Sequence, residues 1–394
     1  MAAIVGVLMR PAFCRMSTRA LSTQMTSEPQ VTFEEHGGAR VINLNRPKQL
    51  NALTLNMIHE IYPKLMAWSH DDRVSVVIMK GVGGKAFCAG GDVIALVQSG
   101  TGQLSDDGYI SRQFMFDEYK LNYTIGTYKK PFVALLNGIT MGGGVGLSVH
   151  GQFRISTDNT LFAMPETAIG LFPDVGGSYF LPRLKGHMGM YLALTGDRIK
   201  STDVYHAGVS THHALGKHMD ELEQALYQVT SQRQIEELIT HFHQQSGADS
   251  TPYGLADHST QIDRFFNLPS VERIMAALEE DGSEWAVKRL QVLQKMSPTS
   301  LKVTHEQITR GASMSFEDIF TMEYRLVQHF IEAKKDFYEG VRALLIDKDN
   351  SPKWDPPSVE EVTQGLVDWY FSPLAKHREL DVKAPMVLPN AANL

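Results

Sequence analysis

The chain has 394 residues, of which 43% are hydrophobic and 21% charged, and its net charge is −7 at pH 7. This composition is typical of a globular protein, and the length suits one large domain plus an appendage. The acidic balance argues against nucleic acid as a partner, and no apolar run reaches the roughly 20 residues that span a bilayer, so we predict no membrane partner.

The first segment, residues 1–27, differs in composition from the rest of the chain. It contains Arg10, Arg15 and Arg19, several Ser and Thr, and no acidic residue. This pattern is typical of a transit peptide, and no charged stretch precedes the initial apolar run as it would in a secretory signal. We therefore predict import into the mitochondrial matrix.

Cysteine and histidine spacing does not indicate a metal site. The two cysteines, Cys14 and Cys88, form neither a CxxC motif nor a metal-ligand spacing, and they suggest a reducing compartment. The neighbouring histidines have no cysteine partner and form no HExxH motif, so we expect solvated or packed side chains at His212, His213, His218, His241 and His243.

Strand and helix patterns alternate from residue 31 onward. Residues 39–45 predict a strand, and Thr54 can cap a helix over 55–69 that Pro63 should bend or interrupt.

Two further segments, 74–81 and 131–138, are nearly continuous apolar runs, the pattern of strands buried on both faces. Each is followed by glycines and then by a helix-like stretch. The order strand, glycine turn, helix, strand predicts βαβ units and an α/β fold.

The strand patterns stop near residue 215, and amphipathic helices follow over 220–244 and 270–296. Ser297 and Pro298 are start signals for another helix. We divide the chain into a transit peptide, a core, a helical insert, a C-terminal helical region and a tail, with the boundaries 1–27, 31–215, 216–295, 296–365 and 366–394.

Two glycine clusters follow the two clearest strands, "FCAGGD" at 87–92 and "MGGGVGLSVH" at 141–150. Glycine lets the backbone turn sharply and lets its N–H groups approach a ligand closely. If the two turns face each other, two N–H groups could bind one oxygen as an oxyanion hole. The alternative is a pair of tight turns without a ligand.

The segment 164–177, "MPETAIGLFPDVGG", holds two acids, Glu166 and Asp174, separated only by apolar, small and turn-forming residues. The pair fits either a solvated surface loop or two carboxylates at the mouth of an apolar pocket. In a pocket, burial and mutual repulsion would set their pKa values.

Together, these motifs resemble the crotonase (enoyl-CoA hydratase/isomerase) superfamily. The similarity runs from about residue 31 to 215 and resumes near the C-terminus, in the stretches 45–53, 87–92, 137–156, 162–184 and 336–354. It implies an α/β fold built as a spiral of ββα units with an additional helical C-terminal region. It also implies an acyl-CoA substrate whose thioester oxygen lies between the N–H groups of Gly91 and Gly143.

The resemblance assigns further roles by position. Lys48 and Ala52 are expected near the adenine end of CoA. Glu118 is expected to make a polar contact with the substrate, although a solvated helix face would also explain it. No cofactor beyond the CoA of the substrate and no metal is implied, and a homo-oligomer is possible in this superfamily.

Position 146 separates two activities within the superfamily. Hydratases that resemble this motif carry a catalytic Glu at the position of Gly146, whereas this chain has glycine there and retains Glu166. Adding water across a double bond is best served by two carboxyl groups, whereas thioester hydrolysis needs one carboxylate and an oxyanion hole. The motifs are most similar to a mitochondrial branch of thioester hydrolases of valine breakdown.

In such a hydrolase, Glu166 would either attack the thioester carbonyl or act as a base on water. Asp174 would bind the 3-hydroxyl of the substrate or hold the water. The alternatives are an enoyl-CoA hydratase or isomerase, an RNA-binding homologue, which would carry a basic surface stretch, and an inactive interaction protein.

Overall fold

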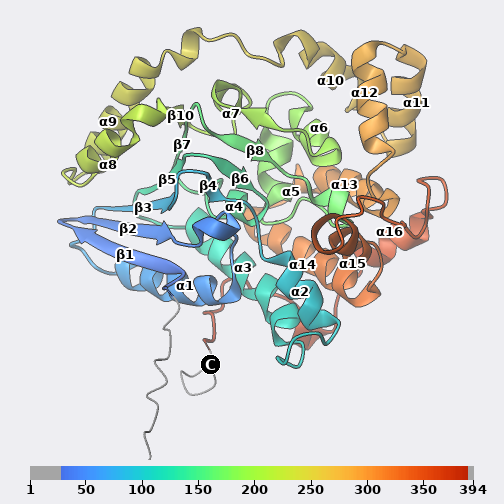
Figure 1. Ribbon diagram of the computed structural model, residues 1–394, viewed down its shortest axis with the longest axis horizontal. Helices are drawn as coiled ribbons and strands as arrows, with labels where there is room; N and C mark the ends of the chain where they lie inside the picture. Colours follow the sequence, from blue (N-terminus) through green and yellow to red (C-terminus); the bar gives the residue numbers. More distant parts are fainter. Residues whose placement is uncertain (1–27, 389–394) are drawn as a thin grey trace, which may run out of the picture.

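The computed structural model describes residues 28–388 (Figure 1). The predicted transit peptide, residues 1–27, lies outside the described residues. The strands occupy one side of the molecule and the helices α11 to α16 the other (Figure 1). Within the described range, no helix is both long and apolar enough to cross a membrane.

The first sheet has the order β1-β2-β3-β5-β7-β10 and is parallel except for the β1–β2 pair. The predicted strands at 39–45, 74–81 and 131–138 are all present in it. Its strands are β1 Val31–His36, β2 Ala39–Leu44, β3 Val76–Gly81, β5 Phe132–Leu136, β7 Phe153–Ser156 and β10 His212–His213.

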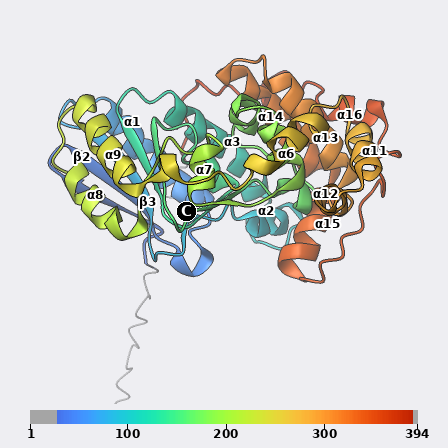
Figure 2. The ribbon, with the colours of Figure 1, turned by 90° about the horizontal axis from the view of Figure 1, so that it is seen from above.

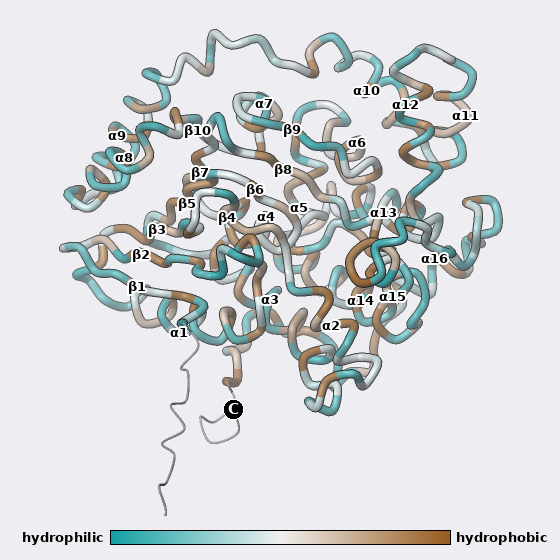
Figure 3. Tube along the Cα trace, in the orientation of Figure 1, coloured by the Kyte–Doolittle hydropathy of each residue, from teal (hydrophilic) through white to brown (hydrophobic). Residues whose placement is uncertain are grey.

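Both faces of this sheet are buried, because successive residues of β3 belong to two different hydrophobic clusters. Val77 and Met79 pack with helices of the core, whereas Val76 and Ile78 pack under the insert helices α8 (Met219–Leu226) and α9 (Gln232–Ser246). Figure 2 shows α8 and α9 lying over β2 and β3, and Figure 3 shows the mixed polar and apolar character of these two helices.

A second sheet, β4-β6-β8-β9, carries the two glycine turns. Strands β4, β6 and β8 are parallel neighbours, so their carboxyl ends lie at one edge. Each follows a strand of the first sheet, which gives the ββα units expected of the crotonase fold. The strands are β4 Ala86–Cys88, β6 Ile139–Met141, β8 Leu161–Ala163 and β9 Ile199–Lys200.

This second sheet corrects one sequence prediction. The glycine clusters do not follow β3 and β5 directly, because β4 and β6 intervene. Short strands of three residues give too little periodicity to be recognised from the sequence. The turns nevertheless face the same edge, since β4 and β6 are themselves adjacent and parallel.

The helix α1 (Leu55–Ser69) begins as predicted, with the Thr54 hydroxyl accepting the Met57 N–H at 3.2 Å. The expectation of an interruption at Pro63 is wrong, since the helix continues through it. The remaining core helices are α2 Val93–Gly100, α3 Tyr109–Gly126, α4 Gly143–Gly146, α5 Gly177–Phe180, α6 Met188–Thr195 and α7 Thr202–His206.

The C-terminal part is helical and packs into the main hydrophobic cluster of the core. Ser297 caps the helix that begins at Pro298, as predicted. Farther along, Leu380, Val382 and Met386 of the predicted tail are buried. The helices are α10 Ser259–Phe265, α11 Val271–Asp281, α12 Glu284–Leu293, α13 Pro298–Gly311, α14 Phe316–Ala333, α15 Asp336–Val341, a π-helix Arg342–Ile346, and α16 Gln364–Tyr370.

Candidate active site

A pocket of about 260 Å³ lies where β4, β6 and β8 end. It contains both glycine turns and all three of the predicted acids, and Leu345 of the π-helix contributes a wall from the C-terminal region. The lining residues are Ala89, Gly90, Gly91, Val93, Phe114, Met115, Glu118, Met141, Gly142, Gly143, Pro165, Glu166, Ile169, Leu171, Asp174 and Leu345.

The first glycine turn is held by backbone pairing with the segment that precedes α1. Leu53 donates its N–H to the Gly90 carbonyl and accepts the Asp92 N–H, both at 2.8 Å. This pairing skips the N–H of Gly91, which donates to no other group in residues 28–388. The N–H of Gly91 is therefore available for a ligand.

The second glycine turn approaches the first closely. A Cβ atom added to Gly143 would lie 3.1 Å from the Gly91 nitrogen, and one added to Gly144 would overlap the Cys88 carbonyl oxygen. A side chain is thus sterically excluded at Gly144, and at Gly143 it would crowd Glu118 and the first turn. Gly91 and Gly143 therefore lie next to each other in the lining of the pocket, where the predicted oxyanion hole would form.

Three carboxyl groups meet these turns from different elements. Glu166 follows β8, so it comes to the same edge as the turn after β6, and its Oε1 lies 2.9 Å from the place of a Cβ on Gly142. Glu118, on α3, has Oε1 at 2.6 Å from the place of a Cβ on Gly143. Both are buried, so the solvated alternatives for Glu166 and Glu118 are wrong.

Asp174 is the only one of the three with a side-chain donor in the described structure. The Tyr119 hydroxyl donates to its Oδ2 at 3.0 Å, and Tyr119 itself is fully buried. By contrast, Oε1 of Glu118 and Oε2 of Glu166 are buried without a protein partner among residues 28–388. Buried oxygens of this kind are usually paired, so a bound substrate or water would complete them.

Burial sets the ionisation of this group of acids. It raises the pKa of Asp174 to about 7, against the stabilising hydrogen bond from Tyr119. Burial also raises the pKa of Glu166 well above its usual range, and the negative charge of Asp174 raises it further. The pKa of Glu118 rises for the same reasons. Burial and mutual repulsion therefore both favour the neutral forms of these acids.

The structure does not bring Lys48 and Ala52 into this pocket. Lys48 is exposed in a short turn, and Ala52 precedes Leu53, the residue that pairs with Gly91. Their predicted contacts with the adenine end of CoA remain predictions. Sequence reasoning missed Arg46, which donates to the Ala52 carbonyl at 2.6 Å and to Asp92 Oδ2 at 3.2 Å. It joins this segment to the first glycine turn.

The space beside Gly146 is occupied by other side chains. A Cβ on Gly146 would lie 2.6 Å from Cβ of Val175 and 2.9 Å from Nδ2 of Asn122. These two side chains fill the space that a longer residue would need. The glycine is therefore part of a packed arrangement with the loop that carries Asp174.

Comparisons with known proteins identify the family of this chain. The enoyl-CoA hydratase/isomerase family model matches residues 39–371. The chain is 53% identical to a mitochondrial 3-hydroxyisobutyryl-CoA hydrolase of Danio rerio over 91% of this chain and 93% of that one. It is 48% identical to the human protein of the same name, over 90% and 91% of the two chains.

Solved structures give the same fold with other names. A carnitinyl-CoA dehydratase from Mycobacterium thermoresistibile superposes with a TM-score of 0.82 at 36% identity, covering 90% of this chain and 99% of that one. An enoyl-CoA hydratase from Rhodobacter sphaeroides superposes with a TM-score of 0.78 at 34% identity, covering 89% and 99%.

We predict that Gly146→Glu lowers stability and does not create hydration of an enoyl-CoA. The new side chain would overlap Val175 and Asn122, and overpacking of this kind costs about 1–3 kcal/mol. Urea unfolding and absorbance of crotonyl-CoA test both parts. Hydratase activity in a variant of native stability would show that position 146 alone separates the two activities.

A second prediction concerns stability and pH. Since burial raises the pKa of Asp174 from 3.8 to about 7, this group stabilises the folded state fully below about pH 4 and loses that contribution as pH rises toward 7. The full loss amounts to about 4 kcal/mol. The test is the decrease in the free energy of unfolding in urea between pH 5 and pH 8. This decrease should be smaller for Asp174→Asn than for the native protein, whereas the exposed control Asp72→Asn should show the native decrease. Equal decreases in all three proteins would contradict the raised pKa.

Proposed function

The chain belongs to the enoyl-CoA hydratase/isomerase family, and from this premise we propose that it hydrolyses 3-hydroxyisobutyryl-CoA to CoA and 3-hydroxyisobutyrate. The observation that carries the proposal is the Glu166 carboxyl group beside the two adjacent glycine turns, with position 146 filled by packing. The curated relatives bearing this name support the substrate.

In the proposed reaction, the N–H groups of Gly91 and Gly143 bind the thioester oxygen as it gains negative charge. Ionised Glu166 attacks the carbonyl carbon directly, or it takes a proton from the water that attacks. The C–S bond then breaks, and the sulfur of CoA takes up a proton. In the direct route, water cleaves the resulting anhydride and regenerates Glu166. Either route needs neither a metal nor an organic cofactor.

We assign the substrate's 3-hydroxyl to Asp174. Oδ2 of Asp174 accepts from Tyr119, and we propose that Oδ1 accepts the substrate hydroxyl. Glu118, unpaired at Oε1, is the second polar group available to the substrate. A site that hydrogen-bonds a hydroxyl discriminates strongly against the analogue that lacks it, because buried groups are then left unpaired.

We further propose that the protein acts in the mitochondrial matrix, at the thioester-hydrolysis step of valine breakdown. The relatives named mitochondrial and the composition of residues 1–27 support this location. We expect neither nucleic acid nor a membrane as a partner. Self-association into a homo-oligomer is compatible with the proposal. The hydratase and dehydratase names of the solved structures define the competing activity.

We predict that Glu166→Gln abolishes CoA release while acyl-CoA still binds, because the amide keeps the shape of the side chain and loses the base or nucleophile. Thiol release measured with a chromogenic reagent, together with calorimetric binding of the substrate, tests this. Near-native turnover by the variant would remove Glu166 from the mechanism.

The role of Asp174 gives another prediction. If Asp174 binds the 3-hydroxyl, Asp174→Asn should lower kcat/KM for 3-hydroxyisobutyryl-CoA far more than for isobutyryl-CoA, and much of the native preference should disappear. If Asp174 instead held the hydrolytic water, both substrates would slow by a similar factor. An unchanged ratio of kcat/KM values would therefore contradict hydroxyl recognition.

A further inference from the structure

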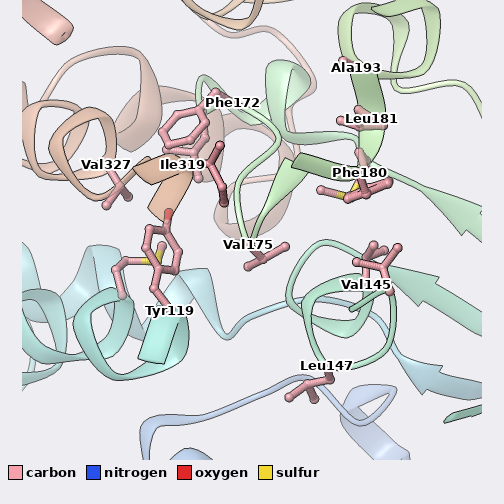
Figure 4. Close-up of a cluster of buried hydrophobic side chains, with 14 of the residues drawn as sticks. Tyr119, Val145, Leu147, Phe172, Val175, Phe180, Leu181, Ala193, Ile319 and Val327 are labelled. Atoms are coloured by element: carbon pink, nitrogen blue, oxygen red, sulfur yellow. The ribbon is translucent and has the colours of Figure 1, made fainter. Parts of the chain in front are cut away.

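The loop that carries Asp174 has a conformation that needs external support. Val175 has φ of 51° and Gly176 φ of 87°, so two consecutive residues are left-handed. A β-branched residue such as valine rarely adopts this conformation, and such outliers persist only where surrounding structure holds them. Figure 4 shows Val175 among buried side chains that include Val145 of α4 and Ile319 of α14.

Two helices of the C-terminal region hold this loop. Glu323 of α14, fully buried, accepts the Gly176 N–H with Oε2 and the Ser178 N–H with Oε1, both at 2.8 Å. Gln307 of α13 donates to the Pro173 carbonyl at 2.6 Å. The loop is thus bonded on both sides of Asp174.

The core adds a third contact, because Nε2 of His150 lies 2.8 Å from the Val175 carbonyl oxygen, at hydrogen-bonding distance. Every residue from Pro173 to Ser178 except Asp174 and Gly177 therefore has a bond to one of these side chains. Asp174 remains free to use its own carboxyl group in the pocket.

Burying a carboxyl group at position 323 costs free energy. No cation pairs with Glu323 among the ion pairs of the described residues, and burial raises its pKa to about 8. The two carboxyl oxygens of Glu323 can nevertheless accept both N–H groups, of Gly176 and Ser178, since each oxygen has a lone pair. The side-chain amide of Gln would turn a donor toward one of those N–H groups.

We propose that Glu323 is a positioning residue for the active site, which fixes Asp174 through the backbone N–H groups of Gly176 and Ser178. The proposal rests on the proposed function for the role of Asp174 in turnover, but the contact itself does not. It assigns to the C-terminal helices a part in catalysis that the pocket lining alone does not reveal.

A double-mutant cycle tests this assignment. Glu323→Gln should lower kcat/KM for 3-hydroxyisobutyryl-CoA by about 100-fold, the cost of a displacement of about 1 Å. In the Asp174→Asn background the same change should cost no more than about two-fold, because its effect passes through Asp174. Effects that multiply in the double variant would overturn the proposal.

Controls separate positioning from general destabilisation. Glu223→Gln removes another buried carboxyl group, one that contacts Lys80 and Tyr227 outside the pocket, and should leave kcat/KM unchanged. If E323Q does not fold, Gln307→Leu removes the contact from α13 instead. It should also lower kcat/KM, again without further effect in the Asp174→Asn background, and multiplying effects would again overturn the proposal.

Hydrogen exchange distinguishes a failure of this proposal from a failure of the proposed function. If the native protein releases no CoA from 3-hydroxyacyl-CoA substrates, the proposed function fails. The segment 172–179 should still exchange its amide protons faster in E323Q, or in Gln307→Leu, than in the native protein and E223Q. Unchanged exchange in this segment would overturn the assignment of Glu323.

Discussion

The close approach of two backbones at the ends of β4 and β6 is the constraint on which the rest of the site depends. Any side chain at Gly144 would overlap the Cys88 carbonyl, so the two strands can end together only if this position is glycine. That approach sets Gly143 beside the N–H of Gly91, which has no acceptor within residues 28–388. Because β8 is the next parallel strand and Glu166 follows it, Glu166 lies at the same edge of the sheet as the two glycine turns.

Collecting three acids in an apolar pocket works against folding, since burial and mutual repulsion both favour the neutral forms. The Tyr119 hydroxyl donates to Asp174 and partly opposes the effect of burial on its pKa, whereas Oε1 of Glu118 and Oε2 of Glu166 have no partner among residues 28–388. The unpaired oxygens that result are those we expect a substrate to meet. The folded protein is thus less stable than it would be with apolar residues there, and we expect the ligand to complete the hydrogen bonds of the site.

The sequence could predict groups whose chemistry and spacing are local. Glycine clusters after strands, an acid after β8, and caps such as Thr54 and Ser297 are all visible in short stretches. Tyr119 and Glu323 could not be predicted, because each acts on the Asp174 loop from a helix far away in the chain, and a Tyr or Glu in an amphipathic helix has no distinctive pattern. The short strands β4 and β6 escaped detection for lack of periodicity, although their glycine turns did not.

Val175 connects two features of this site, the glycine at position 146 and the placement of Asp174. Its Cβ occupies the space beside Gly146, and its left-handed backbone directs the chain from Asp174 into the N–H groups that Glu323 binds. Absence of an acid at position 146 and placement of Asp174 are therefore consequences of one packing arrangement. A glutamate at 146 would require Val175, the residue next to Asp174, to move. Conversion to a site with an acid at position 146 must then involve the loop and the helices that hold it, together with the residue at 146.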